Sequence, residues 1–171
     1  MARKSERKGG TGLAVAAAAG VFLAFSHGSH HHGGLAFLDS FGSPPVHGGR
    51  QVVAFARHQL GCPYVWGGTG PCGSGFDCSG LAMDAWASAG VTIPRTSQEQ
   101  SAQLPHVSRS QLRPGDLVFA AGSDGTPSSP GHVVIYIGHG KVIQAYATGT
   151  PVEVSSLASV HAVSYADPGE R

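Results

Sequence analysis

The chain has 171 residues, enough for one domain with a sizeable core and an additional tail. The formal net charge is +1, but the first eight residues hold four of the 11 basic and one of the ten acidic side chains, so the remainder carries −2. Because this balance leaves no basic surface, it excludes nucleic acid as a partner.

The first 26 residues have the layout of a secretory signal. Four basic residues precede an uncharged apolar stretch over 13–25, which is too short to span a membrane comfortably. Small residues at positions 24 and 26, which a signal peptidase reads, favour cleavage after Ser26, which would start the mature chain at His27. The alternative is an uncleaved anchor that keeps the segment in contact with the membrane. Either way we expect export rather than a buried cytosolic helix.

Residues 27–48 form a linker rich in glycine, histidine and proline, with four histidines clustered between positions 27 and 32. Such a tract is able to bind a transition metal. We interpret it as a solvated spacer, because the histidine cluster has no second kind of ligand beside it and no ordered scaffold.

The folded domain is predicted to cover residues 49–171. Apolar spacing and stop signals predict helices over 51–60 and from Cys78 to about residue 89, and a third, short helix after the turn at 93–97. A run of short apolar segments follows, and this order of helices before antiparallel strands indicates an α+β fold. The predicted strands are 117–120, 132–137, 141–146, 152–154 and 161–165.

The candidate nucleophile is Cys78. Asp77 is a good N-cap, which places Cys78 in the first helical turn. Unpaired backbone N–H groups and the helix dipole favour a negative charge there, so we expect a stabilised thiolate. The alternative interpretation is a buried structural cysteine in a helix of small residues.

A candidate partner for Cys78 is His132, which begins a predicted strand directly after a loop ending in proline and glycine. At that place the imidazole is presented at the rim of a sheet. A cysteine at a helix N-terminus followed by a histidine on a later strand is the arrangement of papain-like nucleophilic catalysis. Four other histidines compete for any role assigned by composition alone; they are His58, His106, His139 and His161.

Five motifs in order carry a family resemblance over roughly residues 49–165. They are YVWGG (64–68), FDCSGL (76–81), PRTS (94–97), PGDLVF (114–119) and GHV (131–133). Together they resemble the NlpC family of bacterial cell-wall cysteine peptidases. The resemblance implies a papain-like α+β fold, and we expect a secreted or wall-associated monomer. It also implies hydrolysis of peptidoglycan stem peptides, usually between D-glutamate (through its γ-carboxyl) and the diamino acid that follows.

The resemblance also implies roles for individual residues. Cys78 is the nucleophile, His132 the general base and later acid, and Gln144 the third polar residue, where histidine is the usual occupant. No metal or cofactor is required. Tyr64 resembles a tyrosine that helps to hold the oxyanion. Residues resembling those that shape the peptide groove are Asp77, Ser79, Arg95 and Ser97, with Arg95 as the expected partner of a stem-peptide carboxylate.

Simple hairpin geometry conflicts with the role of Gln144. A two-residue turn at 139–140 would pair Ile137 with Val142 and direct Gln144 away from His132. A bulge or a sharp bend is needed to bring the two side chains together.

Two further cysteines, Cys62 and Cys72, lie ten positions apart on either side of the glycine-rich loop. In an exported protein a disulfide between them would stiffen one wall of the groove and leave Cys78 as the free thiol. The alternative is two unpaired cysteines.

Two rival functions remain. One is an amidase or acyltransferase that uses the same Cys/His pair on another acyl substrate. The other is a non-catalytic wall-binding module, for which Gln144 is the best support, since a neutral amide adds no charge to stabilise an imidazolium.

Overall fold

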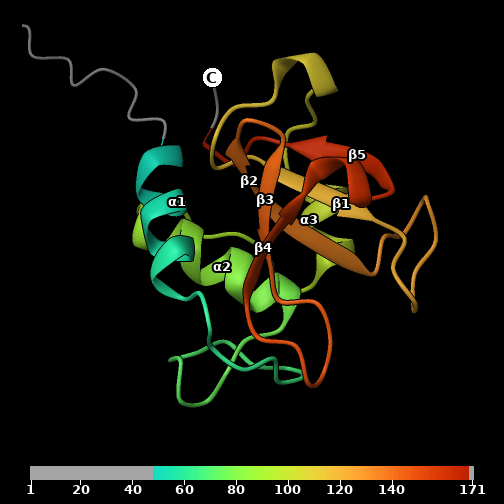
Figure 1. Ribbon diagram of the computed structural model, residues 1–171. Helices are drawn as coiled ribbons and strands as arrows, with labels where there is room; N and C mark the ends of the chain where they lie inside the picture. The colour runs from blue at the N-terminus through green and yellow to red at the C-terminus, as the bar shows by residue number, and fades with distance from the viewer. Residues whose placement is uncertain (1–47, 170–171) are drawn as a thin grey trace, which may run out of the picture. The chain divides into compact units, whose positions relative to one another are not determined.

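The computed structural model describes residues 48–169, so the predicted signal segment (1–26) and the predicted linker up to residue 47 lie outside the described part. Helices come first in this part and an antiparallel sheet follows (Figure 1). The main helices are α1 (Gly49–His58), α2 (Cys78–Ser88) and α3 (Ser97–Gln103), with short 3₁₀ turns η1 (Arg109–Gln111) and η2 (Leu157–Ser159).

The sheet has five strands in the order β4-β3-β2-β1-β5, and every neighbouring pair is antiparallel. This architecture confirms the predicted α+β class. The strands are β1 (Leu117–Ala120), β2 (His132–Gly138), β3 (Lys141–Gln144), β4 (Glu153–Ser156) and β5 (Ala162–Ala166).

The strand β3 is shorter than the predicted segment 141–146. It ends at Gln144 because the chain then enters a turn, in which the backbone N–H of Thr150 donates to the carbonyl of Ala147. Hydrogen bonds between Thr150 Oγ1 and both backbone groups of Ala147 fix the same turn. The loop from β3 to β4 therefore begins directly beside Gln144.

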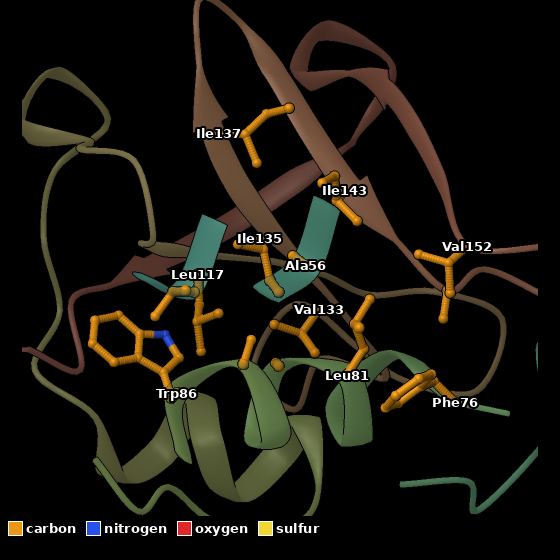
Figure 2. Packing of buried hydrophobic residues seen from close by; sticks show 14 of the residues in the cluster. Ala56, Phe76, Leu81, Trp86, Leu117, Val133, Ile135, Ile137, Ile143 and Val152 are labelled. Atoms are coloured by element: carbon orange, nitrogen blue, oxygen red, sulfur yellow. The ribbon is translucent and has the colours of Figure 1, made fainter. Parts of the chain in front are cut away.

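The main core lies between the helices and one face of the sheet (Figure 2). Side chains alternate along β2, so Val133 and Ile135 contact the helices while Val134 joins a second cluster on the opposite face. Each fully buried large apolar side chain contributes roughly 1.5–3 kcal/mol to stability. The largest fully buried apolar side chains of the main core are Trp86, Phe76, Phe119, Leu81, Leu117, Ile135 and Ile143.

Close backbone contact explains Gly80 in the first turn of α2. A Cβ atom at this position would lie 2.1 Å from the carbonyl oxygen of Gly68. The glycine-rich loop therefore packs directly on the helix that carries Cys78, and a larger residue at position 80 would force them apart.

The hairpin between β2 and β3 has a different register from the one that a simple two-residue turn predicts. Tyr136 pairs with Val142, and the register shifts between Tyr136 and Gly138. The expected pairing of Ile137 with Val142 is therefore wrong. Residues 138–140 all have positive φ, which supports the irregular turn. Ile135 is therefore paired with Ile143. In the same register the next residue of β3, Gln144, lies opposite Val134. The Gln144 side chain is then on the same face of the sheet as His132.

Candidate active site

Asp77 organises the start of α2. Its side chain accepts a hydrogen bond from the backbone N–H of Gly80 at 2.7 Å, as an N-cap does, and Cys78 is the first helical residue. The other carboxylate oxygen accepts from the N–H of Gly67 at 3.0 Å. One buried carboxylate thus joins the helix to the glycine-rich loop.

Arg95 holds Asp77 in place. Its guanidinium donates to both carboxylate oxygens, at 2.6 and 3.1 Å, and to Ser79 Oγ at 2.9 Å. A bidentate pair of this kind fixes geometry as well as charge. In the described part of the chain Arg95 is thus paired with a protein carboxylate, and the hydrogen bond and charge of Asp77 raise the pKa of the guanidinium.

Cys78 lies where α2 meets the start of β2. Its thiol contacts the carbonyl oxygen of Gly131 at 4.0 Å, and Gly131 directly precedes His132. Burial raises the pKa of the thiol, and the charges of Asp77 and Asp124 raise it further, while backbone groups of Val133 and Ser79 lower it. The thiolate is therefore not stabilised as the helix N-terminus alone predicts, because desolvation raises the pKa of Cys78 more than the backbone groups lower it.

His132 is 8% exposed and lies on the sheet face opposite the helices, with Val134. Cys78 and His132 both line one cavity, of about 260 Å³. Burial lowers the pKa of the imidazole, against the effects of Gln144 and Asp124, so the neutral form is favoured. The ring of Tyr146 packs against it edge-on, with 5.4 Å between centroids.

Gln144 orients this imidazole. Its Oε1 lies 3.1 Å from Nε2 of His132, and its amide nitrogen donates to Ser155 Oγ at 2.9 Å and to Glu153 Oε1 at 3.4 Å. A carboxylate only accepts, so the amide nitrogen must face Glu153 and the carbonyl must face the ring. Nε2 is then the protonated nitrogen, and Nδ1 is the free base.

Tyr64 and the remaining predicted residues surround the nucleophile. Tyr64, Asp77, Ser79, Arg95 and Ser97 all line one cavity with Cys78, of about 450 Å³. The pKa of Tyr64 is raised by burial and by the charges of Cys78 and Asp77, so its hydroxyl remains a donor. The structure thus brings together the residues that the resemblance assigned to the groove.

Sequence reasoning missed several supporting residues. Gln100 is fully buried, and its amide nitrogen donates to the carbonyls of Ser79 and Pro94, which joins α3 to the Arg95 turn. Asp124 lines the cavities on both sides of Cys78. No motif distinguishes these residues, because their roles depend on contacts between distant segments.

Cys62 and Cys72 are joined by a disulfide in the structure, and Cys78 is the free cysteine. The bridged segment precedes Phe76, whose backbone bonds to Pro63 and Val65. Within residues 48–169 no group of three or more His, Cys, Asp or Glu side chains is arranged to hold a metal ion. The same residues contain no helix long and apolar enough to cross a membrane.

Comparison with known proteins places this geometry in a family. Residues 61–166 match the NlpC/P60 family. The chain belongs to the NlpC/P60 family. The membership confirms the predicted resemblance and the papain-like α+β fold.

Individual relatives agree with this assignment. A probable endopeptidase of Corynebacterium glutamicum is 45% identical over 116 residues, which cover 67% of this chain and 51% of that protein. A bifunctional muramidase/DL-endopeptidase of Bacillus subtilis is 42% identical over 109 residues, covering 63% of this chain and 32% of that protein. The NlpC/P60 chain therefore spans about half, or less, of the length of these curated relatives.

A solved structure shows the same fold. The peptidoglycan hydrolase RipB from Mycobacterium tuberculosis superposes with a TM-score of 0.63 and 31% identity, covering 74% of this chain and 67% of that chain.

Proposed function

We propose that this NlpC/P60 protein hydrolyses peptidoglycan stem peptides by nucleophilic catalysis, with Cys78, His132 and Gln144 as the catalytic residues. The observation that supports it most is that His132, whose Nε2 lies 3.1 Å from Gln144 Oε1, lines one cavity together with Cys78. The bond cleaved is the one between D-γ-glutamate and the diamino acid, in agreement with the DL-endopeptidase among the relatives.

The resting state contains a neutral thiol and a neutral imidazole, because burial raises the pKa of Cys78 and lowers that of His132. The proton therefore moves during the attack. Nδ1 of His132 takes the thiol proton as the sulfur attacks the peptide carbonyl. Tyr64 and the N–H groups at the start of α2 stabilise the oxyanion.

The intermediate then collapses and the peptide C–N bond breaks. His132 gives its proton to the leaving amine, which departs and leaves a thioester on Cys78. Water, deprotonated by the same imidazole, hydrolyses the thioester and restores the thiol. Gln144 keeps Nε2 protonated throughout, so that Nδ1 alone exchanges protons with the reacting groups.

The cavity of about 450 Å³ that Cys78 lines together with Tyr64 and Arg95 holds the acyl portion of the substrate. Ser79, Ser97 and Tyr64 line it, and the pair of Asp77 and Arg95 supplies its charged wall. We assign these residues to stem-peptide binding. An amidase or acyltransferase would need the same pair of catalytic residues. The relatives are named endopeptidases, which favours a peptide bond as the substrate.

The basic and apolar start of the chain supports export, with cleavage after Ser26 or retention as an anchor, and we infer that the domain acts at the cell wall. The protein then acts outside the membrane as a monomer. Sequencing the mature N-terminus tests this: a start at or near His27 supports cleavage, and full-length protein confined to the cytosol contradicts export.

Incubation with a defined muropeptide tests the proposed activity. Mass spectrometry of the products should show a new carboxyl on glutamate and a new amine on the diamino acid. Release of the intact stem peptide from the sugar would instead show an amidase. Binding to the cell wall without any cleavage would show a non-catalytic module.

A further inference from the structure

Three adjoining cavities form one groove across the candidate active site. Cys78 lines the first two, of about 450 and 260 Å³, and His132 lines the second and a third of about 550 Å³. The nucleophile therefore lies between the first and second cavities, and the imidazole lies between the second and third. The third cavity is the largest, and none of the roles described so far uses it.

The chemistry of cleavage gives this groove a direction. The acyl part of the substrate remains attached to Cys78, while the leaving amine takes a proton from His132. The leaving residue must therefore lie on the His132 side of the scissile bond, where the third cavity begins. The acyl part then occupies the first cavity, lined by Tyr64, Asp77 and Arg95.

The third cavity contains one carboxylate. Glu153 begins β4, pairs directly with Gln144 across the strands and is exposed to solvent in the cavity. No lysine or arginine lines this cavity, and none of the residues 48–169 forms an ion pair with Glu153. Its contact with the Gln144 amide is long, at 3.4 Å. The carboxylate is thus open to a cation in the cavity.

We propose that the third cavity receives the residue released by cleavage, and that Glu153 determines specificity by pairing with an ammonium group on that residue's side chain. This inference rests on the proposed peptidase function. Ser159 and His161, which also line the cavity, supply further polar groups around the same side chain. The preferred leaving residue is accordingly one that carries a second, basic amine.

Two peptides that differ at one position test the inference. Both have γ-glutamyl linkage, one with lysine and one with norleucine as the leaving residue; norleucine keeps the four carbons of the lysine side chain and lacks only its ammonium group. The wild-type enzyme should cleave the lysine peptide with a kcat/KM roughly three- to tenfold higher, as expected for a solvent-accessible ion pair. Raising the salt concentration should shrink this preference.

The variant Glu153→Gln should reduce the ratio of the two kcat/KM values to about one. Glutamine keeps the shape and an acceptor oxygen for Gln144, and any change in imidazole orientation affects both peptides equally. Glu99→Gln is the matched control, because Glu99 is an exposed carboxylate in the capping box of α3, where glutamine also serves. It should keep the wild-type ratio.

A wild-type ratio near one, or an unchanged ratio in Glu153→Gln, would overturn the role of Glu153 while leaving the peptidase function intact. Failure of the wild-type enzyme to cleave either peptide would overturn the proposed function, and the inference with it.

Discussion

Oε1 of Gln144 lies 3.1 Å from Nε2 of His132, and the Gln144 amide nitrogen donates to Ser155. This relationship depends on the irregular β2–β3 hairpin, which brings both side chains to the same sheet face. It assigns the proton on the ring to Nε2 and leaves Nδ1 to act as the base.

Replacing Gln144 by alanine should lower kcat without abolishing cleavage, because His132 loses its orientation but keeps its basicity. We expect a loss of roughly ten- to a hundredfold. Gln144→His, which restores the usual occupant in the family, should retain most of the activity. Steady-state kinetics on a muropeptide measures both. An undiminished rate in the alanine variant would reduce the catalytic residues to Cys78 and His132.

The acidic limb of the kcat/KM profile should have its midpoint below 6.5, the ordinary pKa of histidine. Burial lowers the pKa of His132, so the neutral base persists as the pH falls, and kcat/KM reports the free enzyme. Asp124→Asn should move the midpoint further down, since the Asp124 charge raises this pKa. A midpoint above 6.5 in the wild-type enzyme would contradict a buried, neutral His132.

The rate of Cys78 alkylation in the free enzyme should be low at neutral pH and should keep increasing as the pH is raised through the alkaline range. Desolvation raises the pKa of this thiol, so the reactive thiolate is scarce until the pH is high. A peptide with the sequence of residues 76–81 is the control and should reach its plateau at lower pH. A plateau for the enzyme below pH 8 would show instead a preformed thiolate, as the helix N-terminus alone predicts.

The double variant Cys62→Ser with Cys72→Ser should lower the free energy of unfolding by about 2–3 kcal/mol, because the unfolded chain loses a closed loop. Urea denaturation measures the change, and reduction of the wild-type protein should reproduce it. Three free thiols in the oxidised, denatured wild-type protein would contradict the bridge.

The order of the elements was predictable because each one is encoded locally. The alternation in 132–137 and the helical spacing after Cys78 lie within single elements, and the structure has β2 and α2 at these places. The Asp77 cap was predictable for the same reason. The β2–β3 register was not, because it depends on a bulge near Gly138 that no periodicity records.

The contacts of the candidate site were less predictable than its residue types. Asp77 was expected in the groove and as a cap, but its bidentate pair with Arg95 joins residues 18 positions apart. Glu153 has no motif at all, and only the pairing of β3 with β4 brings it beside Gln144. The raised pKa of Cys78 likewise depends on burial, which a helix position alone does not specify.

Digestion of purified cell wall by the wild-type protein and by Cys78→Ala tests the central claim most directly. Mass spectrometry of the soluble fragments measures cleavage, and circular dichroism verifies that the variant is folded. We predict that the wild-type protein releases peptides with a new amine on the diamino acid and that the folded Cys78→Ala protein releases none. Release at the wild-type rate by Cys78→Ala would contradict the assignment of Cys78 as the nucleophile.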